Sequence, residues 1–483
     1  MLEIMAAILA GTFYGLIVGI IPSAGATTGL VALFGFISWF TAFDPYLGVI
    51  FVMAVVASST TGDSFSGVLL GIPGANSAAA TMIDGFPLAL QGRATYALTS
   101  AITVSTVNGL IWGTLTFALL PWYANLIMIF GIPELWAFVL LALATVGFVS
   151  SKFWVRSLIA ICIGCWIGLI GMDNETGADR FTMGWDYLAD SVQIMPFVAG
   201  LFAIPEILDG LFFKGKVAKI NTTQKGQTWE GIKASWKYKW DGLRGGAIGA
   251  FIGFLPGLGG AMSDWMAYGA TTAMNQNEKI PFGKGNIKGV IGPEGSNNAQ
   301  KATSMIPTVL FGIPGASFAA IVMALFMYLD FELGTPDLVY DPKFFDSLFI
   351  GFMGATIAVC ILCLVFTRWI AMITYVPYWI YGPVLIVFVT WACVQYTGGW
   401  EDYVVLAIFS VIGIACKYLK FSRPAMLMGF ILADRIESLT LQMMGLYTPE
   451  KLLDRPIFIG LMVAVVAMFI YGVFINKQRL DYS

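Results

Sequence analysis

Apolar runs long enough to cross a lipid bilayer follow one another along almost the whole chain, with short polar joints between them. A helix needs about 20 mostly apolar residues to cross roughly 30 Å of hydrocarbon, where only helices and closed barrels bond all their backbone groups. The alternating pattern of barrel strands is absent from this sequence. Only 11% of the residues are charged, against about 25% in soluble domains. We therefore predict an all-α polytopic membrane protein with about 10–12 transmembrane spans.

Residue types that metal and catalytic chemistry commonly need are scarce. The chain has no histidine, which is the usual general base and a frequent metal ligand. Cys162 and Cys165, like Cys360 and Cys363, have CxxC spacing, but both pairs lie in apolar runs where cysteine commonly acts as a small buried hydrophobic residue. We expect no enzyme activity, no metal site, and no cofactor apart from a coupling Na⁺ or H⁺. A membrane-embedded enzyme and a stand-alone channel remain alternatives, although no nucleophile has a base at a convincing spacing.

Basic residues are concentrated in one polar stretch near the middle of the chain. Between Lys214 and Arg244 there are seven Lys and one Arg against two acidic residues. The positive-inside rule places such a loop in the cytoplasm, and counting back one span places the acidic loop at residues 172–190 outside. We expect residues 214–243 to form a cytoplasmic connecting loop. The first apolar run lacks a basic leader and a cleavage site, so we expect it to be a retained helix.

Two motifs occur twice, about half a chain length apart. The segment "AGTFYGLIVGIIPSAGA" (residues 10–26) aligns with "RGGAIGAFIGFLPGLGG" (residues 244–260), with four Gly and one Pro in register, and GIPGA occurs at residues 71–75 and 312–316. The four-residue glycine spacing favours close helix packing. We interpret residues 1–213 and 244–483 as two repeats. The charges of the flanking loops indicate that the chain enters the two GIPGA segments from opposite sides of the membrane. We therefore predict inverted repeats, which are typical of secondary transporters.

Each GIPGA motif predicts a break in a helix. The limb from Thr61 to Gly71 is about eleven residues, or roughly 16 Å as a helix, which is half the hydrocarbon thickness. Two such limbs would form a re-entrant hairpin, at residues 61–90 in the first repeat and 295–330 in the second. Free N–H groups after the break attract anions, and free carbonyls before it attract cations.

The predicted site residues lie at these breaks and at the similar breaks after Pro22 and Pro256. We expect an anionic substrate to bind free amides and hydroxyls, and coupling cations or protons to bind intramembrane carboxylates and amides. The substrate-binding candidates are Pro22, Ser23, Gly25, Thr27, Thr28, Pro73, Gly74, Asn76, Pro256, Gly257, Gly259, Pro314, Gly315 and Ser317. The coupling candidates are Asp63, Asp264, Glu294, Asn297 and Asn298.

The chain resembles the large membrane subunit of tripartite tricarboxylate transporters, the TctA family. The resemblance is carried by "VLLGIPGANSAAATMIDGFPLALQGRATYAL", "IGFLPGLGGAMSDWMAYGATTAMN" and "FGKGNIKGVIGPEGSNNAQKATSMIPTVLFGIPGASFAAIVMALF". The family motif also falls on Asp84, Gly85 and Gly92. Ser23 and Gly71 depart from the family pattern, in which Gly and Asn are usual.

This resemblance implies a multi-pass permease of the bacterial inner membrane that imports carboxylates such as citrate on a cation gradient. It implies two partners, a small four-helix membrane subunit (TctB-like) and a periplasmic solute-binding protein (TctC-like), and no nucleic acid. By similarity to elevator-type carboxylate transporters, one bundle carrying both hairpins would move against a scaffold.

Overall fold

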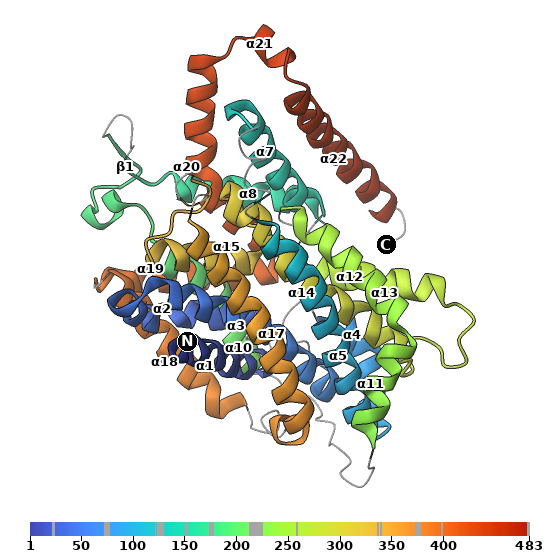
Figure 1. Ribbon diagram of the computed structural model, residues 1–483. Helices are drawn as coiled ribbons and strands as arrows, with labels where there is room; N and C mark the ends of the chain where they lie inside the picture. Colours follow the sequence, from blue (N-terminus) through green and yellow to red (C-terminus); the bar gives the residue numbers. More distant parts are fainter. Residues whose placement is uncertain are drawn as a thin grey trace.

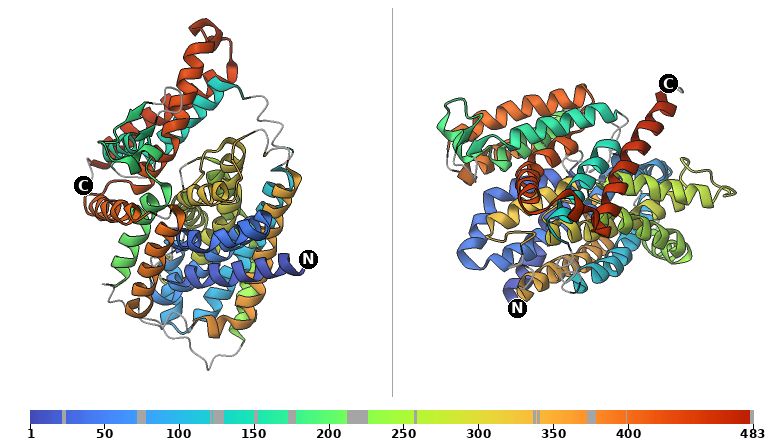
Figure 2. Two further views of the ribbon diagram at one scale, coloured as in Figure 1. Left: turned by 90° about the vertical axis from the view of Figure 1, so that its left-hand side faces the viewer. Right: turned by 90° about the horizontal axis from the view of Figure 1, so that it is seen from above.

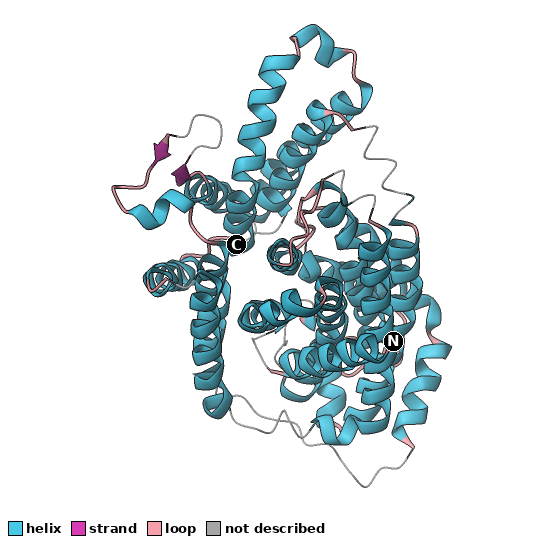
Figure 3. Cartoon of the chain, turned by 60° about the vertical axis from the view of Figure 1, so that its left-hand side comes forward, coloured by secondary structure: helices cyan, strands magenta, loops and turns pink. Residues whose placement is uncertain are grey.

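Helices account for almost all of the regular structure, as Figure 1 shows for the computed structural model. The described residues are 1–21, 25–71, 78–120, 122, 130–149, 153–172, 178–211, 226–256, 259–335, 338, 341–371, 378–397 and 399–480. Within them, two short antiparallel strands, β1 (Gly171–Met172) and β2 (Asp179–Arg180), form a small ladder. Figure 3 shows this ladder at the edge of the molecule. The prediction of an all-α protein is therefore confirmed apart from this minor element.

The helices fall on either side of the basic connecting stretch. Before it lie α1 (Leu2–Ile20), α2 (Gly25–Phe43), α3 (Pro45–Leu70), α4 (Thr81–Leu90), α5 (Ala94–Gly113), the π-helical turn η2 (Thr114–Ala118), α7 (Ile132–Val149), α8 (Trp154–Gly168), the 3-10 turn η3 (Asp186–Asp190), α9 (Ile194–Val198), the π-helical turn η4 (Ala199–Ala203) and α10 (Ile204–Leu211). After it lie α11 (Gln227–Lys237), α12 (Lys239–Phe254), α13 (Gly259–Met274), α14 (Lys288–Phe311), α15 (Ser317–Tyr328), α17 (Pro342–Ala371), α18 (Tyr378–Thr397), α19 (Glu401–Tyr418), α20 (Arg423–Leu446), α21 (Pro449–Leu453) and α22 (Pro456–Leu480).

Several helices are apolar on the outside as well as the inside. Within the described ranges, four are long and apolar enough to cross a membrane by length and composition: Leu2–Ile20, Pro45–Leu70, Ala94–Ala118 and Pro342–Thr367. Shorter apolar helices of 10–17 residues accompany them. Outward-facing side chains such as Val365 on α17 and Val463 on α22 are 66% and 62% exposed. Such helices suit contact with lipid, and the count of 10–12 spans stays a prediction.

The glycine-rich first helix of each proposed repeat packs closely along a later helix of the same repeat. A Cβ atom added to Gly15 of α1 would lie 2.7 Å from the carbonyl oxygen of Val55 on α3. One added to Gly249 of α12 would lie 2.7 Å from the Cα atom of Ser296 on α14. Only glycine allows backbones to approach so closely, so the predicted close packing at this spacing is confirmed.

The two long helices of these pairs, α3 and α14, are each flanked by a helix from the other half of the chain. Helix α5 packs against α14, and α17 packs against α3. Both long helices also end in the same way: Gly71 follows α3 with φ 65°, and Gly312 follows α14 with φ 63°. This left-handed conformation favours glycine and ends a helix. The chain then returns in the short helices α4 and α15.

The structure corrects the predicted length of the limbs before the GIPGA motifs. Residues 61–71 do not form a separate half-length limb, because α3 continues without a break over 26 residues and α14 over 24 residues. The polar residues inside α3 do not break it, since their hydroxyls bond to carbonyls of the same helix, for example Ser58 to Ala54 and Ser66 to Asp63. Only the limbs after the motifs are short, with 10 residues in α4 and 12 in α15.

An arm of helices extends from the body formed by the two packed pairs. We define the arm as α7, α8, α20, α21 and α22. Figures 1 and 2 show α20 leaving the body and α22 returning alongside α7. Two ion pairs stabilise the arm. Arg455 Nη1 lies 2.7 Å from Glu134 Oε2 on α7, and Nη1 of Arg180 in β2 lies 2.6 Å from Glu437 Oε1 on α20.

Candidate functional site

Helices α3 and α14 meet at a cluster of buried polar side chains, which we call the polar crossing. The contributing residues of each helix are three or four positions apart, and one of them directly follows another. Such spacings place their side chains toward one side of the helix. None of them is more than 3% exposed. Its members are Ser59, Asp63 and Ser64 on α3, with Glu294, Asn297 and Lys301 on α14.

Glu294 connects the two halves of the chain within this crossing. Its Oε1 accepts a hydrogen bond of 2.8 Å from the hydroxyl of Ser64. Its Oε2 accepts one of 3.3 Å from the amide of Asn297, one turn along α14. The structure thus places three of the predicted coupling residues, Asp63, Glu294 and Asn297, in one buried cluster.

Lys301 is the positive charge of the crossing. Its ammonium donates to the hydroxyl of Ser59 at 3.1 Å and to the carbonyl of Val56 at 3.3 Å. It interacts electrostatically with Asp63, which lies one helical turn after Ser59 on the same helix. The ammonium also lies 5.5 Å from the ring centroid of Phe318, in the first turn of α15. Our sequence reasoning assigned no role to Lys301, although a lysine inside "NNAQKATSMIP" was a visible signal.

Asp264 approaches the crossing from α13. Its Oδ2 accepts a hydrogen bond of 2.5 Å from the backbone N–H of Ala80, the residue before α4. The charge of Glu294 acts on this carboxyl group. Asp264 therefore holds the start of the first short limb and lies within electrostatic range of the crossing.

Several buried amide atoms near the crossing make no hydrogen bond within the described part of the chain. They are Asn297 Oδ1, Asn298 Oδ1, Asn298 Nδ2 and Gln300 Nε2. Asn298 faces α5, where a Cβ atom on Gly109 would lie 3.1 Å from its Cβ atom. An unpaired buried polar atom destabilises a fold by about 1–3 kcal/mol. These atoms keep their bonding capacity for an ion or a polar ligand.

Asp84 is a further buried carboxylate, and the sequence reasoning left it without a role. Its Oδ1 accepts hydrogen bonds from the backbone N–H groups of Gly283, Gly285 and Asn286 at 2.8 to 2.9 Å. Its Oδ2 accepts one of 3.0 Å from the hydroxyl of Tyr268. Asp84 on α4 therefore organises the loop before α14, which belongs to the other half of the chain. Its only sequence signal was its place in the family motif.

The turn after α14 folds back onto that helix. The N–H of Gly315 donates to the hydroxyl of Thr308 at 3.1 Å. A Cβ atom on Gly315 would lie 2.7 Å from the carbonyl oxygen of Ser304. In this conformation the Gly315 amide is therefore used inside the chain. Pro314 is buried in the same turn, and Ser317 is half-buried at the first residue of α15.

The remaining predicted substrate-binding residues fall into two groups. Those that lie outside the described residues are Pro22, Ser23, Pro73, Gly74, Asn76 and Gly257. Those that the structure describes at the starts and ends of helices are Gly25, Thr27, Thr28, Pro256 and Gly259. Thr28 is buried and its hydroxyl makes no hydrogen bond within the described ranges. None of these five residues has a hydrogen bond to the polar crossing among the described contacts.

Among the residues that the structure describes, no group of three or more His, Cys, Asp or Glu could hold a metal ion.

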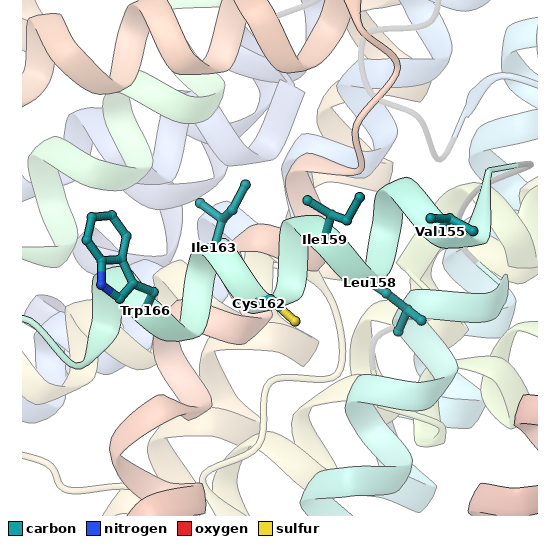
Figure 4. Close-up of a pocket in the computed structure, with 6 residues that line it drawn as sticks. All are labelled: Val155, Leu158, Ile159, Cys162, Ile163 and Trp166. Atoms are coloured by element: carbon teal, nitrogen blue, oxygen red, sulfur yellow. The ribbon is translucent and has the colours of Figure 1, made fainter.

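An apolar groove lies away from the polar crossing. It runs along α8 with a volume of about 400 Å³ (Figure 4) and is lined by Val155, Leu158, Ile159, Cys162, Ile163 and Trp166. With an apolar lining from a single helix, it suits a lipid chain better than a charged solute.

Comparison with known proteins shows that the chain is similar to a family of transporters. Residues 5–428 match the family model described as the "Tripartite tricarboxylate transporter TctA family". The chain is 27% identical over 428 residues to a protein of Agrobacterium vitis named "Uncharacterized 52.8 kDa protein in TAR-I ttuC' 3'region", covering 88% of this chain and 84% of that protein. It is 26% identical over 190 residues to the "Uncharacterized protein in TAR-II ttuC' 3'region" of the same organism, covering 39% of this chain and 78% of that protein. No solved structure matches the chain.

Proposed function

Because this chain belongs to the tripartite tricarboxylate transporter TctA family, we propose that it is the large permease subunit of a carboxylate importer driven by a cation gradient. It would take its substrate from a periplasmic solute-binding protein and work beside a small four-helix membrane subunit, in the bacterial inner membrane. The observation that carries the proposal is the polar crossing, where one ammonium and two carboxylates from both halves of the chain are buried together. A buried ionisable cluster of this kind in a membrane protein is a functional site by default.

The charges around the crossing favour cation coupling. Lys301 balances one carboxylate, which leaves Glu294 and Asp264 as two further acidic groups in the buried interior. Uncompensated buried charge is strongly unfavourable, so these groups need protons or a cation. The carboxylates and the unpaired amide oxygens of Asn297 and Asn298 are suitable ligands for Na⁺, and the carboxylates can equally carry protons.

The packing of the helices supports an origin by duplication. The pairs α1 with α3 and α12 with α14 use the same glycine spacing, and both long helices end at a glycine with the same backbone conformation. We propose that residues 1–213 and 244–483 are inverted repeats joined by the cytoplasmic loop at residues 214–243. The short limbs α4 and α15, each preceded by a GIPGA motif, would then belong to two hairpins that move together against a scaffold, giving alternating access by an elevator motion.

Uptake by the reconstituted complex tests this function. The full chain and its two proposed partners are placed in liposomes, and uptake of radiolabelled citrate and succinate is followed under an imposed Na⁺ or pH gradient. We expect saturable uptake that depends on one of the gradients. Linear uptake without saturation would contradict the proposal and favour a channel, and no gradient dependence would contradict cation coupling.

Replacing Glu294 by glutamine tests the site. We expect E294Q to lower gradient-driven uptake about tenfold or more, since the variant loses the charge that a proton or cation neutralises. The matched control is E278Q, because Glu278 lies near the surface and pairs with Lys288, 2.6 Å away. Wild-type uptake by a folded E294Q protein would contradict the assignment.

A further inference from the structure

Lys301 is a buried cation for which a purely structural role gives an incomplete account. Its two hydrogen bonds, to Ser59 and to the carbonyl of Val56, could be made by a neutral donor. Burying an ammonium is much more unfavourable than burying a neutral amide, and the attraction of a buried partner often does no more than offset this. A glutamine at this position would join α3 to α14 with less desolvation. The charge of Lys301 therefore points to a use beyond joining the two helices.

The place of Lys301 in the fold indicates what that use is. The ammonium bonds to α3 on one side and lies against Phe318, in the first turn of α15, on the other. One turn further along α14, Ser304 contacts Gly315 of the turn between α14 and α15. Lys301 is thus next to the turn where the second GIPGA motif lies. A carboxylate that reaches this turn meets a fixed positive charge, and the start of α15 adds to the attraction.

Asp63 competes with such a carboxylate. Asp63 lies one helical turn after Ser59, whose hydroxyl accepts a hydrogen bond from Lys301, and both charged side chains are buried there. The nearby carboxylate attracts the ammonium. Glu294 and Asn297, which are the natural neighbours for a cation, lie on the same face of α14, and Ser64 adjoins Asp63 while bonding to Glu294. An Asp63 carboxylate released from Lys301 would therefore join groups that already suit a cation.

We propose that Lys301 binds a carboxylate of the transported substrate, and that the substrate does so by taking the place of Asp63. Release of Asp63 then completes the binding site for the coupling Na⁺ or H⁺, together with Glu294. This exchange rests on the proposed transport function and deepens it. Its consequence is that the substrate raises the affinity for the cation and the cation raises the affinity for the substrate by the same factor.

Uptake kinetics of paired variants test the exchange in the complete reconstituted complex, with radiolabelled citrate and succinate as probes. We expect K301Q to raise the half-saturating concentration of the carboxylate about tenfold or more, and K301R to raise it less. We expect D63N, which removes a carboxylate of the cation site, to lower gradient-driven uptake and to weaken the dependence of this uptake on cation concentration. The matched control is K288Q, since Lys288 is a largely buried lysine of the same helix that bonds to Asn275 and Glu278.

Folding is separated from function by the double variant D63N/K301Q. It replaces a buried charged pair by a neutral pair, which commonly preserves or increases stability. If Lys301 is only structural, the single variants lose folded protein, and the double variant recovers wild-type half-saturation and cation dependence. That recovery, or unchanged half-saturation in K301Q, would overturn the exchange while leaving the transport function intact. If the wild-type complex takes up neither probe, the proposed function fails, and the exchange fails with it.

Discussion

At the scale of single residues, buried carboxylates of this protein have different tasks that their residue type does not reveal. Glu294 bonds to two polar side chains in the crossing, and Asp264 accepts one backbone N–H ahead of α4. Asp84 accepts three backbone N–H groups and a tyrosine hydroxyl. A carboxylate saturated by backbone donors organises a loop, whereas one with neighbouring side chains and unpaired amides can exchange its partners.

The organising role of Asp84 predicts a local loss of structure in D84A. Removing the acceptor leaves three backbone N–H groups of the loop before α14 unpaired, which we expect to destabilise the protein by about 3 kcal/mol or more. Melting of the purified protein, followed by a thiol-reactive dye, measures the change. Limited proteolysis should show new cleavage within residues 275–287. The control is D346A, because Asp346 is exposed on α17. An unchanged cleavage pattern in D84A would show that the loop is held by other contacts.

At the scale of helices, backbone contact through glycine decides which elements pair. Helix α1 lies along α3 and α12 along α14 because the glycine positions of each first helix admit the partner backbone. Two kinds of contact explain why α3 stays continuous through its polar segment. Its hydroxyls bond within the helix, and α1 and α17 cover it on two sides.

Glycine-to-alanine exchange at matched positions tests this packing. In G15A and in G249A the new methyl group would overlap the partner backbone, and we expect each to lose about 1–3 kcal/mol of stability. The control is G269A on α13, where nothing lies within 4 Å of an added Cβ atom. That variant should be neutral or gain up to about 1 kcal/mol from helix propensity. Thermal melting of the three purified variants compares them, and equal melting temperatures would contradict close packing as the cause.

At the scale of the whole molecule, contacts between the two halves make one body. Helix α5 packs on α14, and α17 packs on α3. The hydrogen bonds of Glu294 with Ser64, of Lys301 with Ser59 and of Asp84 with Gly283 each join residues that lie about 200 or more positions apart. The polar crossing therefore exists only when both halves are folded together. The arm adds ion pairs of its own and leaves its apolar groove facing outward.

The predicted orientation of the whole chain is tested by labelling single cysteines in a variant without the six native ones. Positions Met183 and Lys233 are both exposed. We expect a cysteine at Met183, in the acidic loop, to react with an impermeant maleimide in intact spheroplasts. A cysteine at Lys233, on α11, should react only after lysis, because the basic loop is expected to be cytoplasmic. The opposite pattern would reverse the orientation.

Much of this protein could be anticipated from local chemistry. Apolar runs specify membrane helices because a helix pairs the backbone N–H and C=O groups, which have no water to bond to in hydrocarbon. A four-residue glycine spacing specifies close helix packing within each half. The partner of each charged group could not be predicted in this way. Lys301 finds Ser59 across 242 positions, and Asp84 finds the loop before α14 across about 200. Such pairs arise from the crossing of helices, which no local pattern encodes, so only the folded chain brings the ammonium to the carboxylates.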